Sequence, residues 1–254
     1  MPGTQGMTMT SSDLWTHEMA ARYDDAMAKI STPDAVKPAV DLLAELADGG
    51  PVCEFAIGTG RIGIPLSRRG LSVTGIELSE PMVQELHRKD PDLPVTIGDM
   101  ATTAVGDDFA LVYLVFNTIG NLRTQPEQVA CFANAAAHLR PGGSFVVEVG
   151  VPQLQRLPPG QTAIPSDISE EHVGLDTYDL VTQQATSHHY NQQPDGSYRF
   201  APHHYRYVWP SELDLMAQLA GMNFEARYAD WGRSPFVATS DSHVSIWRKG
   251  SALT

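Results

Sequence analysis

The sequence has little of what marks several protein classes. Only two of its 254 residues are cysteines, Cys53 and Cys131, and both lie in apolar stretches, so we interpret them as buried thiols rather than a disulfide. Lys and Arg number 17 against 30 Asp and Glu and form no basic stripe, which argues against nucleic acid or an anionic membrane as a partner. No apolar run approaches the roughly 18 residues that a membrane-spanning helix requires.

Metal-binding and targeting patterns are also scarce. The nine histidines form no HxxxH motif and the cysteines form no CxxC motif, so we expect no metal. The first residues lack a basic region followed by an apolar core, so we expect no secretory signal and a cytoplasmic protein. A hydrophobic content of 42% in a chain of this length favours one α/β domain with an insertion over two full domains.

Short β-rich runs alternate with helical patterns along most of the chain. An N-terminal helix is expected over 13–30, a second helix begins at Pro33 behind the cap Thr32, and RPGG at 140–143 predicts a turn. Later helices are predicted near 61–69, 79–89, 124–139 and 211–220, and strands at 52–57, 72–77, 95–100, 109–116, 144–150, 223–230 and 243–248. Apolar strands separated by amphipathic helices predict a Rossmann-like, mostly parallel seven-stranded sheet with helices on both faces.

The alternation of predicted strands and helices stops after the fifth strand. Residues 151–209 contain the turn formers PPG and DG and alternating stretches such as TSHHY and HHYRYVW. Such alternation is typical of antiparallel strands rather than βα units. A long excursion inside a compact domain more often forms a lid than an idle loop, so we interpret 151–209 as a β-rich lid insertion.

A glycine motif carries the strongest chemical signal. The segment CEFAIGTGRIG (53–63) places glycines between a strand and a helix, where the backbone turns tightly and a ligand can approach the main chain. The helix N-terminus that follows offers free N–H groups to an anionic group. Because Gly58, Gly60 and Gly63 also satisfy GxGxxG, a dinucleotide-binding fold remains an alternative at this point.

Two acids at strand ends narrow the choice of cofactor. Glu77 ends the second strand 19 residues after Gly58, where a carboxylate can accept both hydroxyls of a ribose, so adenosine is expected in either case. Asp99, in GDM at the end of the third strand, would reach the same edge and suits an adenine amino group. Roughly 100 residues follow the fifth strand, too few for the second domain of most dinucleotide enzymes.

These motifs together resemble those of class I S-adenosylmethionine-dependent methyltransferases. The resemblance is close over about residues 20–150. The pattern FNTIGNL…HLRPGGSFVVE also looks similar to the aminosugar N-methyltransferase branch of natural-product pathways, which carries a β-rich insertion after the fifth strand. One departure is Ala56, which replaces the usual first glycine with only an added methyl group. The residues that carry the resemblance are Glu54-x-Ala56-x-Gly58-x-Gly60, Glu77 within GIELS, GDM (98–100), FNTIGNL (116–122) and LRPGG (139–143).

The resemblance implies S-adenosyl-L-methionine as the cofactor and roles for the residues around it. Gly58 and Gly60, beside Ala56, would lie beneath the methionine portion, and Arg61 or Tyr23 would meet its carboxylate; helix packing is an equal alternative for Tyr23. The ribose would be held by Glu77 and the adenine by Leu78, Asp99 and Met100, with Phe116 and Asn117 beside the sulfonium. The domain division is then a helical cap at 1–30, a cofactor-binding core at 31–150, the acceptor-binding lid at 151–209 and a last helix with two core strands at 210–254.

The acceptor side is expected in the lid. Adjacent residues of a strand point to opposite faces, so one member of each pair, His188–His189 and His203–His204, would face inward as a candidate base. Surface histidines are an equal alternative for each of them. The candidate acceptor-lining aromatic residues are Tyr190, Tyr205, Trp209 and Trp231, which could instead pack the lid.

The predicted function is methyl transfer to a nitrogen or oxygen of a small molecule in secondary metabolism. A nicotinamide-dependent oxidoreductase and a non-enzymatic S-adenosylmethionine-binding protein are the alternatives. We expect a small-molecule acceptor as partner, with no nucleic acid and no membrane, and leave a homodimer open.

Overall fold

A computed structural model describes residues 16–250. The helices are α1 (His17–Ala26), α2 (Pro33–Ala47), α3 (Gly63–Arg68), α4 (Glu80–Lys89), α5 (Gln125–His138) and α6 (Pro210–Leu219), with short 3₁₀ turns η2 (Ala28–Ile30), η3 (Thr118–Asn121) and η4 (Leu154–Arg156). The strands are β1 (Val52–Phe55), β2 (Val73–Glu77), β3 (Val95–Ile97), β4 (Phe109–Leu114), β5 (Leu139–Gly150), β6 (Ala163–Ile168), β7 (His172–Tyr178), β8 (Gln184–Gln192), β9 (Tyr198–Arg206), β10 (Met222–Tyr228) and β11 (Ser242–Lys249). Within these residues no helix combines the length and apolar character that crossing a membrane requires.

The larger sheet has seven strands in the order β10-β11-β5-β4-β1-β2-β3. β11 runs antiparallel to both of its neighbours, and the other described pairings are parallel. The central strands β1 and β4 are buried along their whole length, as expected for a sheet covered on both faces. This confirms the predicted fold class.

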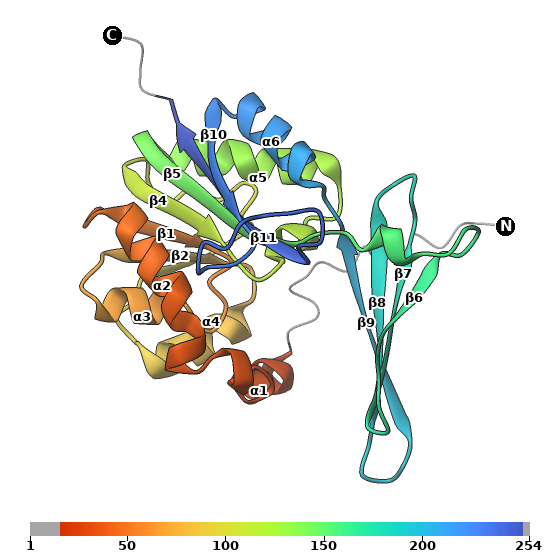
Figure 1. Ribbon diagram of the computed structural model, residues 1–254. Helices are drawn as coiled ribbons and strands as arrows, with labels where there is room; N and C mark the ends of the chain where they lie inside the picture. The colour runs from red at the N-terminus through yellow and green to blue at the C-terminus, as the bar shows by residue number, and fades with distance from the viewer. Residues whose placement is uncertain (1–15, 251–254) are drawn as a thin grey trace, which may run out of the picture.

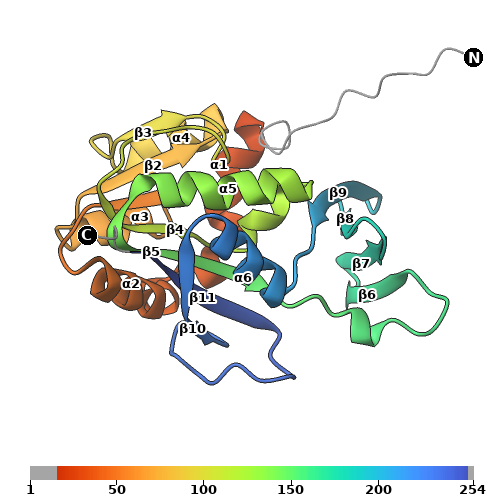
Figure 2. The same ribbon diagram turned by 90° about the horizontal axis from the view of Figure 1, so that it is seen from above.

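Helices cover both faces of the large sheet (Figure 2). α5 and α6 bury Phe132 and Met216 against one face, and α2 buries Leu43 against the other, beside α3. α5 begins with a capping box, in which Thr124 and Glu127 exchange hydrogen bonds. These two layers hold the strand ends of the sheet in fixed positions.

Some predicted boundaries differ from the structure. The helix predicted over 13–30 begins at His17, because Thr16 caps it, and leaves helical geometry at Met27; residues 13–15 lie outside the described residues. β3 ends at Ile97, because the chain turns at Asp99, whose side chain accepts a hydrogen bond from Ala101 N. The predicted turn at 140–143 lies inside β5, where the pairing with β4 shifts register.

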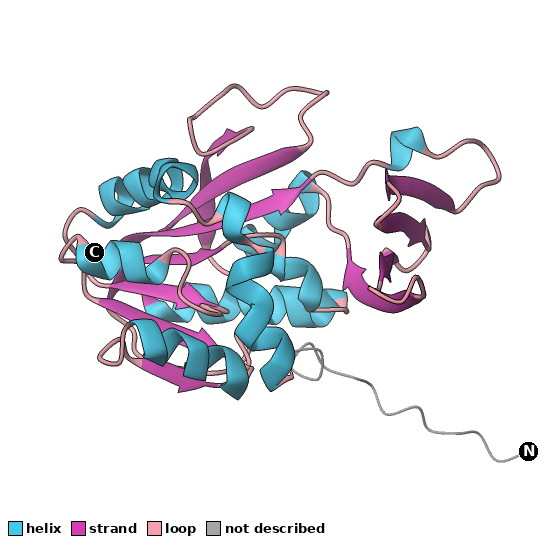
Figure 3. Ribbon diagram, turned by 90° about the horizontal axis from the view of Figure 1, so that it is seen from below, coloured by secondary structure: helices cyan, strands magenta, loops and turns pink. Residues whose placement is uncertain are grey.

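A separate antiparallel sheet, β6-β7-β8-β9, follows β5 and confirms the predicted β-rich insertion. Figure 1 shows this second sheet beside the core, reached from β5 and leading back through β9 to α6. In Figure 3 the helices gather around the large sheet, whereas the second sheet carries little helix of its own. Helices therefore leave one face of the second sheet uncovered, and this face can turn toward the end of β5.

Candidate active site

The carboxyl ends of the parallel strands meet at one edge of the large sheet. The loops that leave β1, β2 and β4 there contain Gly58, Leu78 and Asn117, and the turn after β3 contains Asp99. In open α/β sheets ligands bind in the crevice outside this edge. The predicted cofactor residues therefore lie together in space.

Three residues of the first loop have a backbone conformation that L side chains rarely adopt. Ala56, Gly58 and Gly60 have φ angles of +53°, +57° and +82°. A Cβ at Gly58 would contact nothing within 4 Å and would project into open space, whereas one at Gly60 would lie 2.7 Å from Ile64. Gly58 thus leaves room for a ligand against the main chain, and Gly60 allows α3 to pack closely. Ala56 costs about 1–2 kcal/mol in this conformation, which explains why glycine is usual there.

Glu77 is buried at the end of β2 and joins two loops. Its carboxylate accepts hydrogen bonds from Gly58 N at 2.9 Å and from Ser79 N at 2.8 Å. Burial raises the pKa of this carboxyl, and the backbone N–H groups oppose that shift. An ionised carboxylate has about four acceptor positions, so two remain for the hydroxyls of a ribose.

The turn after β3 is held at the same edge of the sheet by its own hydrogen bonds and by α5. Asp99 Oδ1 accepts a hydrogen bond from Ala101 N at 2.8 Å, and Asn134 of α5 donates to Met100 O at 2.9 Å. Met100 is buried and Leu78 is half-buried. The second carboxylate oxygen of Asp99 is the group that would accept from an adenine amino group.

Replacing Asp99 tests this assignment. We expect Asp99→Ala to weaken S-adenosylhomocysteine binding about tenfold, because one hydrogen bond to a charged acceptor is lost. Binding of the inosine analogue, which lacks the amino group, should weaken less. The measurement is isothermal titration of both ligands into parent and variant. An unchanged ratio of the two affinities would assign adenine recognition to another residue.

Arg61 and Tyr23 approach the same edge from different elements. The Arg61 guanidinium lies 5.0 Å from the ring centre of Phe116, a cation–π contact. Burial raises the pKa of Tyr23, and the nearby Arg61 charge opposes the shift while Glu77 adds to it. α1 thereby brings Tyr23 within electrostatic reach of both residues.

The loop after β4 is held against the end of β5. Phe116 and Asn117 have φ angles of +60° and +63°. Phe116 N donates to Glu148 at 3.0 Å, and Asn117 Oδ1 accepts from Gly150 N at 2.6 Å. Two consecutive strained residues fixed in this way are typical of functional sites.

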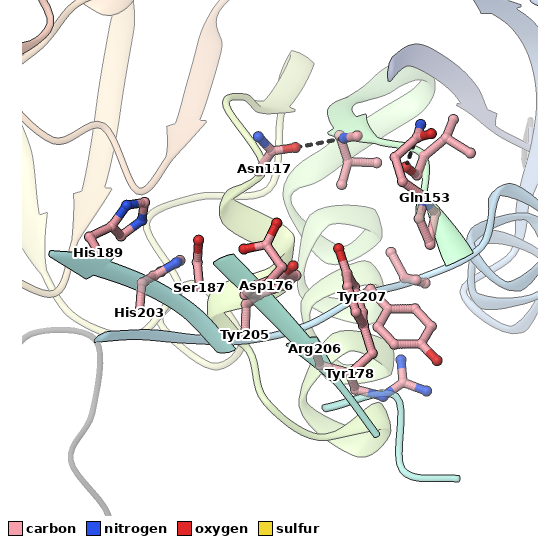
Figure 4. Close-up of a pocket in the computed structure, with 16 residues that line it drawn as sticks. Asn117, Gln153, Asp176, Tyr178, Ser187, His189, His203, Tyr205, Arg206 and Tyr207 are labelled. Atoms are coloured by element: carbon pink, nitrogen blue, oxygen red, sulfur yellow. Dashed lines mark hydrogen bonds between the residues drawn. The ribbon is translucent and has the colours of Figure 1, made fainter. Parts of the chain in front are cut away.

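A cavity of about 280 Å³ lies between this loop and the second sheet. Figure 4 shows Asn117 on one side and side chains of β7, β8 and β9 on the other. The second sheet contributes Asp176 and Tyr178 from β7, Ser187 and His189 from β8, and His203 and Tyr205 from β9. Alternation along each strand places all six on the same face.

The structure brings only one histidine of each predicted pair to the cavity. His189 and His203 line it. His188 hydrogen-bonds Thr177 and stacks on Phe200 on the opposite face. His204 is exposed and hydrogen-bonds Thr186 on that same opposite face.

The predicted acceptor-lining aromatic residues divide in the same way. Tyr205 lines the cavity. Tyr190 lies on the opposite face with 36% of its surface exposed, because it follows His189 in the strand. Trp209 precedes α6 and packs on Tyr207, while Trp231 donates to Glu148 and lines a different cavity beside Arg61 and Phe116. The structure therefore places Tyr190, Trp209 and Trp231 away from the cavity between the loop after β4 and the second sheet, called the lid cavity below.

Sequence reasoning missed two acids, of which Glu54 is buried and Asp176 is half-buried. Glu54 lies beneath the glycine loop, where Tyr113 Oη donates to it at 2.7 Å. Its position in the first motif was a usable signal. Asp176 lines the lid cavity, and its Oδ1 is buried without a hydrogen-bond partner among the described residues. Nothing in the local sequence marks Asp176.

Glu54 predicts how stability depends on pH. Burial raises the pKa of its carboxyl to about 8 from 4.5, so its contribution is fully present below pH 4.5 and is lost as pH rises through 8. Burial lowers the pKa of His243 from 6.5 to about 4, which costs stability only below pH 6.5. Above pH 6.5 we therefore expect unfolding free energy to fall by a few kcal/mol toward pH 8.5.

Chemical denaturation at pH 6.5 to 8.5 measures this loss. Glu54→Gln should flatten most of the slope, because the amide fills the same site without ionising. Glu77, whose pKa is also raised, accounts for a residual slope. An equally steep slope in the variant would show that Glu54 is already ionised in the folded protein.

The described residues contain no cluster of His, Cys, Asp or Glu that could hold a metal ion. The site combines a glycine loop, an acid at the end of β2 and a cavity on the far side of the loop after β4, an arrangement that suits a group-transfer enzyme with an adenosine-containing cofactor. Comparison with known proteins agrees with this class.

The family model described as "Methyltransferase domain" matches residues 52–143. The structure of the CcbJ methyltransferase from Streptomyces caelestis superposes with a TM-score of 0.80 at 35% identity, covering 92% of this chain and 96% of that one. The chain is also 26% identical over 200 residues to cypemycin N-terminal methyltransferase of a Streptomyces species, covering 76% of this chain and 80% of the relative. It is 33% identical over 138 residues to dTDP-3-amino-3,6-dideoxy-alpha-D-glucopyranose N,N-dimethyltransferase of Streptomyces fradiae, covering 53% and 54%.

The chain belongs to the S-adenosylmethionine-dependent methyltransferase family. The predicted family, enzyme class and cofactor are thereby confirmed. Neither alternative, the nicotinamide oxidoreductase or the non-enzymatic binding protein, finds support among these relatives.

Proposed function

We propose that this enzyme transfers a methyl group to the amine nitrogen of a small natural product, bound between the β4 loop and the second sheet. The observation that carries the proposal is the cavity that joins Asn117 and Gly150, at the edge of the cofactor site, to the inner face of the lid. The relatives named for N-methylation support the same chemistry.

The charge of the cavity suits a protonated amine. Asp176 Oδ1 is buried without a partner, and such an oxygen is costly unless a ligand donates to it. The rings of Tyr178, Tyr205 and Tyr207 line the same space and would add cation–π attraction. An ammonium group satisfies both features.

The one cation among the lining residues does not oppose this. Arg206 is buried, and its guanidinium donates to Glu212 at 2.7 Å and to Gln183 at 3.0 Å. Glu212 forms an ion pair with Arg206, and Asp176 is the one acid among the described lining residues.

The cofactor residues keep the roles that the resemblance implies. We propose that Gly58 lies against the methionine portion, that Glu77 holds the ribose and that Asp99 takes the adenine amino group. The open space at Gly58 and the two remaining acceptor positions of Glu77 support this fit. S-adenosylmethionine supplies an already activated methyl group, so the protein has to hold the amine in line and remove its proton.

Two histidines are placed to remove that proton. Burial lowers the pKa of both His189 and His203, so both are neutral near pH 7. His203 Nε2 lies 3.1 Å from Asn121 Oδ1 and is occupied as a donor there. We propose His189 as the base, because its other ring nitrogen lies 3.0 Å from a second histidine, His172, whereas that of His203 meets an amide; Asp176 would be the ammonium anchor.

Turnover with a defined panel tests the function. The panel comprises dTDP-3-amino-3,6-dideoxy-α-D-glucose, the methyl glycoside of the same aminosugar, piperidine, and the corresponding sugar with hydroxyl in place of amine. We expect S-adenosylhomocysteine formation with at least one amine and none with the hydroxyl compound. Methylation of the hydroxyl compound alone would contradict an amine acceptor.

A further inference from the structure

Three side chains form a chain of hydrogen bonds from the lid surface to the cavity. His189 Nδ1 lies 3.0 Å from His172 Nε2, and His172 Nδ1 lies 2.9 Å from Asp167 Oδ2. The strands β8, β7 and β6 each contribute one member. His189 lines the cavity, His172 is 25% exposed, and Asp167 is 64% exposed.

We propose that Asp167 and His172 form a charge relay to His189, which moves the positive charge of the acceptor's proton from the cavity to the surface of the lid. This inference rests on the proposed amine methylation, because only a protonated acceptor has such a proton to give.

The hydrogen-bond pattern fixes which nitrogen acts as the base. Because Asp167 accepts from His172 Nδ1–H, neutral His172 has an unprotonated Nε2. That nitrogen accepts from His189 Nδ1–H, which leaves His189 Nε2 unprotonated. A side chain that lines the cavity is thus held in the tautomer of a general base.

The proton step balances without another reactant. The substrate ammonium gives one N–H proton to His189 Nε2, and the Nδ1–H proton of His189 passes to His172 Nε2. The product of this step is a neutral amine, a neutral His189 and a His172 imidazolium paired with Asp167. The amine lone pair then forms the N–CH₃ bond as the C–S bond breaks. After product release the proton on His172 Nε2 returns to His189 Nδ1, and the proton on His189 Nε2 leaves to water, which restores the starting tautomers.

The local packing leaves space for this arrangement. Gly174 lies directly opposite His189 in the sheet, between His172 and Asp176 along β7. A Cβ at Gly174 would lie 3.1 Å from His172 Cε1 and 2.7 Å from Ser166 Oγ. A larger residue would push the His172 ring away from its two partners.

The charges around His189 define the expected pH behaviour. Burial and the neighbouring His172 and His188 lower the pKa of His189, and Asp176 opposes them. His203 lies on the facing strand β9, and the opposite wall of the cavity adds no free charge among the described lining residues. Asp167 is the one acid that hydrogen-bonds the histidine pair directly.

The first test is ¹⁵N NMR of the histidine ring nitrogens in the full-length protein with S-adenosylhomocysteine bound. We expect both His172 and His189 to show a protonated Nδ1 and an unprotonated Nε2, and Asp167→Ala to abolish this preference in His172. Asp195→Ala, which replaces an exposed acid in the turn between β8 and β9, is the matched control and should leave both tautomers unchanged. A protonated Nε2 on His189 in the parent, or a His172 tautomer unaffected by Asp167→Ala, would overturn the relay.

The second test separates a relay from simple positioning. His172→Gln keeps an acceptor for His189 Nδ1–H but cannot take up a proton. His172→Leu removes both the acceptor and the nitrogen that takes up the proton. If the relay operates, both variants should lose at least about tenfold in turnover of the active panel amine, with unchanged S-adenosylhomocysteine affinity. Full turnover in His172→Gln would reduce His172 to a positioning residue. A parent enzyme that methylates no amine would contradict the proposed function, while the NMR result would still decide the relay.

Discussion

Glu77→Ala is expected to lose at least about 100-fold in affinity for S-adenosylhomocysteine. The variant leaves the two ribose hydroxyls without their acceptor, at about 1–3 kcal/mol. It also releases Gly58 N and Ser79 N, which the carboxylate holds at 2.9 and 2.8 Å. Because Gly58 belongs to the loop against which the cofactor lies, the loss of binding and the loss of loop order add in the same direction.

Isothermal titration measures this affinity in parent and variant. Glu80→Ala is the matched control, because Glu80 is the exposed acid in the first turn of the following helix. We expect the control to bind normally. A circular dichroism melt establishes that Glu77→Ala is folded at the titration temperature. Affinity within threefold of the parent in a folded variant would remove Glu77 from the cofactor site.

The cofactor edge could be predicted because its signals are local. A strand, a glycine turn and a helix follow one another within CEFAIGTGRIG, and parallel strands bring their carboxyl ends to one edge whatever the loops do. Glu77 and Asp99 could therefore be placed at the same edge from their positions alone. The positive φ of Ala56 could not be predicted, because alanine gives no sign of a left-handed backbone.

The acceptor side depends on which face of each lid strand looks inward. Alternation predicted that one histidine of each pair faces the cavity, but the sequence does not set the phase. Which histidine of each pair faces inward is set by the strand register, which places Ser187 opposite His203 and His189 opposite Ala201. It is also set by the face of the second sheet that packs toward the loop after β4. A shift of one residue would have brought His188 and His204 inward instead.

Asp176 illustrates a site residue that only tertiary structure reveals. In sequence it is one acid among several in the insertion, next to Thr177 and Tyr178. The structure pairs it with Ser187 across the sheet, places it in the wall of the cavity and leaves one of its oxygens buried without a hydrogen-bond partner among the described residues. An unsatisfied buried acceptor indicates a ligand that donates, which no local pattern can encode.

Asp176→Asn is expected to lower kcat/KM for the active panel amine by about 100-fold and to raise the stability of the free enzyme. The carboxylate would pair with the ammonium at the wall of the cavity, and removing one partner of a desolvated ion pair costs about 2–5 kcal/mol. Without ligand, the same carboxylate has a buried oxygen with no donor among the described residues, so a neutral amide should relieve about 1 kcal/mol or more. Opposite effects on catalysis and stability are what a ligand-binding acid produces.

Steady-state kinetics and thermal melts measure both effects on the same preparations. Asp179→Asn is the matched control, because Asp179 is an exposed acid just beyond the same strand and caps the turn at Thr182. It should leave kcat/KM unchanged and lower the melting temperature slightly. If Asp176→Asn lowers the melting temperature along with activity, the carboxylate supports the fold of the lid rather than the acceptor. Unchanged kcat/KM with a higher melting temperature would place the amine elsewhere in the cavity, because the buried charge would then be removed without any cost to binding.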